Sequence, residues 1–134
     1  VVGSALVGQE FKDDKYFHGR PSARVNSVVA SLASDRAIIV TACVGDARQA
    51  VLAARRLHPD IALIDVSMPG GGVRATRSVL QVSPLTKVVA FSGHDDQGVI
   101  DAMVAAGAVG YVRKGGSIVD LKSAIHRAAA PERE

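Results

Sequence analysis

The alternation of strand-like and helix-like segments after residue 36 constrains the fold of this chain most strongly. Four short runs are rich in β-branched and other apolar residues, as expected for strands buried on both faces of a sheet. They are AIIVTAC (37–43), DIALIDV (60–66), KVVAFS (87–92) and GYVRK (110–114). Strands that are joined through helices by short connections form right-handed βαβ units. The sequence therefore predicts an α/β fold, a doubly wound parallel sheet flanked by helices.

Helical spacing of apolar residues marks the segments between these runs. Asp46 is placed to cap the first helix, Gly107 to end the third and Ser117 to start the last. Gly70–Gly72 lacks the lysine and hydroxyl of a phosphate-binding loop and is interpreted as a flexible turn before the second helix. The residues expected to face the core are Ala47, Ala50, Val51, Ala54, Leu57, Val73, Val79, Leu80, Val99, Ile100, Met103, Val104, Ile118, Leu121, Ala124, Ile125 and Ala128.

The N-terminal part of the chain fits this pattern less well. A doubly wound sheet of about five strands needs a further strand before the predicted helix VNSVVASLAS (25–34). The candidate is VVGSALVG (1–8), an atypical or replaced first strand, because glycine and serine are poor residues for a central strand. We therefore divide the chain into an atypical N-terminal segment (1–24), a globular domain (25–130) and a tail (131–134).

Composition excludes several classes of protein. The 134 residues are 48% hydrophobic and 22% charged, which suits one globular domain. No apolar run is long enough to span a bilayer, and the single Cys43 excludes an internal disulfide and fits a reducing cytoplasm. The net charge of +3 is mild and dispersed, and tryptophan is absent. We therefore expect a cytoplasmic domain that binds neither a membrane nor, directly, nucleic acid.

Polar side chains occur where three predicted strands end. Asp65, Ser92 and Lys114 lie near carboxyl ends, where open parallel sheets bind their ligands. An aspartate can accept a phosphoryl group as nucleophile, a serine can hydrogen-bond a phosphoryl oxygen, and a lysine can neutralise the added charge. Mg²⁺ would bind Asp65 together with carbonyl oxygens and nearby carboxylates. The alternative for Asp65 is a carboxylate that caps a loop or pairs with Lys114.

These segments resemble the receiver domain of two-component response regulators, which is a flavodoxin-like fold, over about residues 25–130. IALIDVSMPG (61–70) resembles the phosphoacceptor strand and the turn after it. VVAFSGHDD (88–96) resembles the fourth strand with its hydroxyl residue, and GAVGYVRKGG (107–116) resembles the fifth strand with its lysine. Three ordered motifs at suitable separations carry the resemblance.

The resemblance implies a role for each matching residue. Asp65 would accept a phosphoryl group from a histidine kinase or a phosphotransfer protein, with Ser92 and Lys114 assisting. Tyr111 would be the switch aromatic, and the backbone carbonyl of Ser67 would bind Mg²⁺. A protein of this kind is a signalling phosphoacceptor with at most self-phosphotransfer and dephosphorylation chemistry, and is not a metabolic enzyme.

One element of the family pattern is not evident. Receivers usually end their first strand with two acidic residues that hold Mg²⁺, and VVGSALVG (1–8) has no such pair. Asp13 and Asp14 are adjacent acids, but they lie farther ahead of the helix at Val25 than the family arrangement would put them. Two functions stay open: a phosphorylated switch, acting through a partner or a homodimer, and a pseudo-receiver that serves only as a protein-interaction module.

The N-terminal segment has a resemblance of its own. GSALVGQEFKDDKYFHGRPSA (3–23) resembles part of the C subunit of the potassium-transporting P-type ATPase, through its G-S-x-L-x-G-Q-x-F start and its Y-F-x-x-R-P-S-A end. Because the match covers only this short segment, it implies a junction between two unrelated sequences and does not imply potassium transport. A third interpretation is therefore a rearranged fusion fragment, in which Asp13 and Asp14 belong to the foreign segment.

Overall fold

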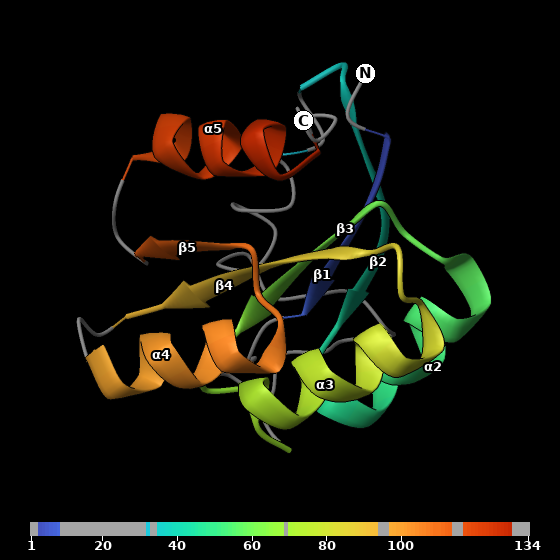
Figure 1. The fold of residues 1–134 in the computed structure, drawn as a ribbon. Helices are drawn as coiled ribbons and strands as arrows, with labels where there is room; N and C mark the ends of the chain where they lie inside the picture. Colours follow the sequence, from blue (N-terminus) through green and yellow to red (C-terminus); the bar gives the residue numbers. More distant parts are fainter. Residues whose placement is uncertain are drawn as a thin grey trace, which may run out of the picture.

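A computed structural model of the chain describes residues 3–8, 32, 35–68, 70–93, 97–113 and 117–129. It contains one five-stranded parallel sheet with the order β2-β1-β3-β4-β5 (Figure 1). The strands are β1 (Gly3–Gly8), β2 (Ile38–Val44), β3 (Ile61–Asp65), β4 (Lys87–Ser92) and β5 (Gly110–Arg113). The helices are α2 (Ala47–Leu57), α3 (Gly72–Val82), α4 (Gln97–Ala106) and α5 (Ile118–Ala129). Apart from Leu32, the predicted helix 25–34 lies outside the described residues.

Strand β1 is central in the sheet. It pairs in parallel with β2 on one side and with β3 on the other, and its register with β2 shifts between Ala5 and Leu6. The predicted first strand is therefore confirmed, although its composition disfavours a central position. Gly3 and Gly8 are the first and last residues of the strand, so the weakening effect of glycine falls on its ends and not on its interior.

Two hydrophobic clusters cover the two faces of the sheet. Successive residues of a strand point to opposite faces, and accordingly Ile61 and Leu63 pack with α5 while Ala62 and Ile64 pack with α2 and α3. Figure 1 shows α5 on one side of the sheet and α2, α3 and α4 on the other. Every residue of β3 is buried, and so is every residue of β4 after Lys87, which confirms the prediction of coverage on both faces for these two strands. For β2 the prediction is wrong: this strand lies at the edge of the sheet, and Ile39 keeps 60% of its surface accessible.

The predicted helix ends agree with the structure. Asp46 accepts a hydrogen bond of 2.8 Å from the backbone N–H of Gln49, so it caps α2. Ser117 accepts one of 3.0 Å from the backbone N–H of Val119, at the start of α5. In the described part of the chain, none of the helices is both long enough and apolar enough to cross a bilayer.

Three of the residues predicted to face the core are exposed. Leu57, Val104 and Ile118 keep 42%, 56% and 38% of their surface accessible. In α4 apolar residues surround much of the helix, so only part of them can face the sheet, and Met103 and Ala106 take the buried positions. Periodicity alone could not select which side of such a helix is buried.

Candidate functional site

Asp65 is the last residue of β3, and its side chain is fully buried. The apolar residues before it place this carboxylate at the carboxyl end of a central strand. Asp65 lies opposite Phe91 of β4 in the parallel register. A carboxylate in such a position requires hydrogen-bond or charge partners, because burial without them costs several kcal/mol.

Ser67 supplies two of these partners. Its backbone N–H and its hydroxyl each donate a hydrogen bond of 2.9 Å to Oδ1 of Asp65. The backbone N–H of Met68 donates to the carbonyl of Asp65 at 3.1 Å, which closes the turn after β3. The carboxylate is therefore held in one orientation by its own loop.

Ser92 ends the neighbouring strand β4 and is 3% exposed. The backbone N–H of Val66 donates to the carbonyl of Phe91 at 2.9 Å, so the ends of β3 and β4 are bonded together. The structure thus brings Asp65 and Ser92 to the same edge of the sheet, as the sequence predicts.

Tyr111 lies on β5 opposite Ala90. Ser92 follows Ala90 by two positions, and residues two apart on a strand share a face. Ser92 and Tyr111 therefore lie on the same side of the sheet, the side that α2, α3 and α4 cover. Tyr111 is half-buried against the hydrophobic cluster on this side.

Three of the predicted site residues fall in parts of the chain that the structure does not describe. Lys114 directly follows the last residue of β5 in the sequence, but it lies outside the described residues, as do Asp13 and Asp14. In the described portion, no group of three or more histidine, cysteine, aspartate or glutamate residues could hold a metal ion. The oxygen ligands that Asp65 and Ser67 could contribute at this edge would have to be completed by water or by other residues.

Sequence reasoning missed the role of Gly72. This residue was expected in a flexible turn, but it is the buried first residue of α3, and its N–H donates to the carbonyl of Val66 at 3.1 Å. A Cβ at this position would lie 2.6 Å from Cα of Val66 and 2.8 Å from the carbonyl oxygen of Asp65. Only glycine allows α3 to begin so close to the Asp65 loop. The sequence signal is the glycine run itself, in which Gly70 and Gly71 have positive φ angles of 89° and 92°.

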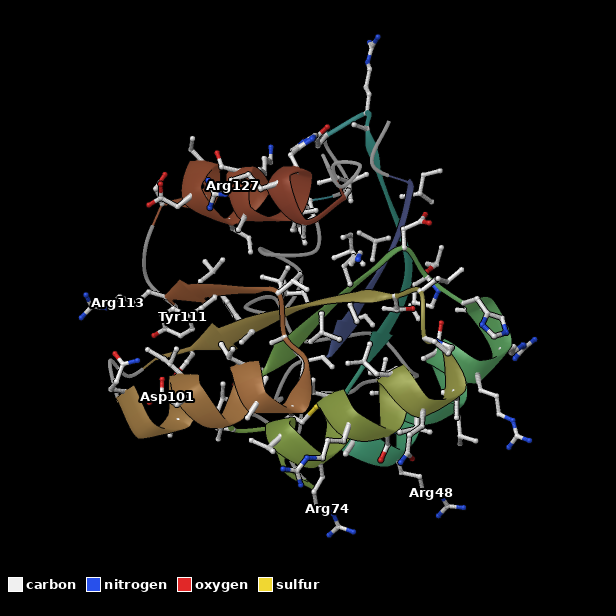
Figure 2. All side chains as sticks on the ribbon, in the orientation of Figure 1. Arg48, Arg74, Asp101, Tyr111, Arg113 and Arg127 are labelled. Atoms are coloured by element: carbon white, nitrogen blue, oxygen red, sulfur yellow. The ribbon has the colours of Figure 1, made fainter. Side chains whose placement is uncertain are left out.

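Arg113 is a second residue that sequence reasoning missed. It ends β5 and lies opposite Ser92 in the register. Figure 2 shows its side chain extending outward from the end of β5. The sequence feature that could have identified this residue is its position directly before Lys114. Arg113 adds a positive charge near the edge of the sheet that holds Asp65 and Ser92.

Comparison with known protein families identifies the family to which this chain belongs. Residues 22–126 match the family model described as the response regulator receiver domain. The chain belongs to this family. The receiver is a domain of two-component signal transduction.

Individual relatives support both resemblances. The receiver is 41% identical over 81 residues to the response regulator GacA of Pseudomonas viridiflava. The aligned residues make up 60% of this chain and 38% of GacA. The chain thus spans about two fifths of the length of the GacA proteins it matches. A 23-residue stretch is 91% identical to the potassium-transporting ATPase KdpC subunit of Rhodopseudomonas palustris, and covers 17% of this chain and 11% of that subunit.

Solved structures share the fold of this receiver. A two-component response regulator of the LuxR family from Aurantimonas superposes with a TM-score of 0.79 at 26% identity, over 95% of this chain and 84% of that one. The receiver domain of the sensor histidine kinase PA1611 from Pseudomonas aeruginosa, with a magnesium ion in its active site cleft, has a TM-score of 0.74 at 23% identity. That match covers 95% of this chain and 97% of the other.

Proposed function

We propose that this receiver accepts a phosphoryl group on Asp65 from a histidine kinase or a phosphotransfer protein. A carboxylate oxygen of Asp65 attacks the phosphorus atom, the bond from phosphorus to the donor nitrogen breaks, and an acyl phosphate forms. The observation that supports this proposal is the fully buried Asp65 at the strand end, oriented by Ser67 and bonded through its loop to the end of β4.

The neighbouring side chains would assist this transfer. The hydroxyl of Ser92 would donate a hydrogen bond to a phosphoryl oxygen, and the ammonium group of Lys114 would offset the added negative charge. Tyr111 shares a sheet face with Ser92, so we propose that its ring responds when Ser92 moves toward the phosphoryl group.

Mg²⁺ is the cofactor that this chemistry would use. Asp65 and the backbone carbonyl of Ser67 would supply two oxygen ligands, with Asp13 and Asp14 as candidates for others. The ion would screen the negative charge of the phosphodonor as it approaches the carboxylate.

The receiver would act as a cytoplasmic signalling module and not as a metabolic enzyme. We propose that residues 25–130 form the signalling domain and that its output is a contact with a partner protein or a second copy of the chain, without direct binding of nucleic acid. Residues 1–24 would contribute a strand to the sheet and no transport activity.

The decisive experiment measures covalent phosphorylation. The protein is incubated with acetyl phosphate or phosphoramidate, with and without Mg²⁺, and its intact mass is recorded. We expect a Mg²⁺-dependent phosphoryl adduct that is absent from Asp65→Asn and present in Asp101→Asn, a control that alters an exposed carboxylate on α4. A folded protein that forms no adduct under any condition would refute the proposal.

A pseudo-receiver is the second candidate function. It is favoured by the lack of a cluster of acidic residues around Asp65 in the described part of the chain. Such a protein would keep the fold and bind its partner equally well with aspartate or asparagine at position 65. The same mass measurement separates the two functions.

A further inference from the structure

Helices α2 and α3 form a basic surface on the side of the sheet opposite α5. The two helices pack against each other, and neither contains an acidic residue. Their charged residues are all arginines and all exposed, namely Arg48, Arg55, Arg56, Arg74 and Arg77. Among the described residues none of the five takes part in an ion pair. We call these five arginines, together with the exposed Leu52, the α2–α3 face.

A groove lies on this face where the two helices begin. Its volume is about 270 Å³. It is lined by Ala47, Arg48, Val51, Gly70, Arg74 and Ser78. Figure 2 shows the side chains of Arg48 and Arg74 extending in the same direction, away from the sheet. The groove therefore combines an apolar floor with two guanidinium groups at its border.

The chemistry of the groove selects one class of occupant. A guanidinium group binds a carboxylate through two parallel hydrogen bonds. Ala47 and Val51 line the groove, and Leu52, one helical turn after Arg48 on α2, is 55% exposed. These side chains offer apolar contacts that a phosphodiester backbone does not use. A protein segment that carries both carboxylates and an apolar side chain satisfies both parts of the surface.

We propose that the α2–α3 face docks an acidic, amphipathic segment of a partner protein. Carboxylates of the segment pair with Arg48 and Arg74, and an apolar side chain between them enters the groove. This contact does not require phosphorylation of Asp65, so it goes beyond the function proposed above. It does lie beside the phosphoacceptor loop, since Gly70 lines the groove and a Cβ there would be 2.8 Å from Cβ of Ala47.

Fluorescence anisotropy with a labelled synthetic peptide tests this proposal. The peptide is an amphipathic helix with glutamates on one face and leucines on the other, and a matched peptide has glutamine at each glutamate position. We expect the acidic peptide to bind and the glutamine peptide to bind at least about tenfold more weakly, which corresponds to about 1.4 kcal/mol. The double variant Arg48→Glu with Arg74→Glu should lose at least the same factor.

The controls separate a specific contact from general charge attraction. Arg36→Glu combined with Arg127→Glu alters the net charge equally at exposed positions away from the α2–α3 face and should bind the peptide like the wild type. Asp65→Asn should also bind normally, which keeps this test independent of phosphorylation. The proposal is overturned by an absence of peptide binding, by an equal loss in both double variants, or by tighter binding of a DNA duplex through Arg48 and Arg74.

Discussion

Ser67 donates two hydrogen bonds to the same oxygen of Asp65, one from its backbone N–H and one from its hydroxyl, both at 2.9 Å. The donor lies only two residues after the acceptor, so the turn and the orientation of the carboxylate form together. The exposed Ser67 thereby orients the carboxylate of the fully buried Asp65.

Removal of the Ser67 hydroxyl should destabilise the receiver. Ser67→Ala leaves the backbone donor in place but takes away one hydrogen bond to a buried charge, so we expect the free energy of unfolding to fall by about 1.5 kcal/mol. Urea denaturation measures this change. Ser123→Ala on α5, a partly exposed position, is the control and should change stability by less than about 0.5 kcal/mol. Equal stability of Ser67→Ala and the wild type would contradict the role assigned to this hydroxyl.

Substitution of Gly72 should cost more than an ordinary exchange of glycine for alanine. The added Cβ of Gly72→Ala would meet backbone atoms of Asp65 and Val66 at 2.6–2.8 Å, so α3 or the Asp65 loop must shift, and we expect a loss of about 2 kcal/mol. Gly110→Ala is the matched control, because its Cβ would meet only side-chain atoms of Val89 at 3.8 Å. A thermal melt in which both variants unfold at the same temperature would argue against the close approach at Gly72.

Ser92 is predicted to matter for the rate of phosphorylation and much less for folding. Ser92→Ala should slow adduct formation by about a hundredfold, since loss of one hydrogen-bond donor to a reacting oxyanion has an effect of this order. The time course of phosphorylation by acetyl phosphate, followed by intact mass, gives the rate. Ser123→Ala should react at the wild-type rate, and an unchanged rate for Ser92→Ala would remove Ser92 from the mechanism.

The contact between Asp35 and His126 predicts a pH dependence of stability. His126 Nε2 lies 2.9 Å from Oδ2 of Asp35, and this hydrogen bond, with a second from the N–H of Ala37, lowers the pKa of Asp35 below its usual 3.8. A carboxyl group with a lowered pKa stabilises the fold above its unfolded pKa, and this contribution is lost as the pH falls through the folded value.

The variant Asp35→Asn should therefore be less stable than the wild type at neutral pH. The difference should shrink once the pH falls below the unfolded value of 3.8. Urea unfolding curves at several pH values test this expectation. A difference that is constant across the whole range would show that the charge of Asp35 is not responsible.

Deletion of residues 1–8 should abolish cooperative folding, because β1 bonds to both β2 and β3. Without it the two neighbours would expose unpaired N–H and carbonyl groups in the middle of the sheet. Circular dichroism during heating would show this as the loss of a sharp transition. Deletion of residues 131–134 is the control and should leave the transition intact.

Local sequence patterns predicted the strands β3 and β4 to within one residue, because both are continuous apolar runs of strand length that contain β-branched residues. They also placed Asp65 and Ser92 at one edge of the sheet. The central position of β1 could not be predicted with the same ease, because it depends on pairing with two distant strands. Gly72 was misinterpreted for a related reason: the close approach of α3 to Val66 exists only in three dimensions.

The pairing of β1 also determines when the sheet can form during synthesis. Ala5 of β1 pairs with Ile61 of β3, so β1 can complete its pairing only after β2, α2 and β3 have also left the ribosome. At ordinary translation rates this delay lasts several seconds. Throughout it, β1 lacks its partner β3, and this nascent stage is where a chaperone would have the most to protect.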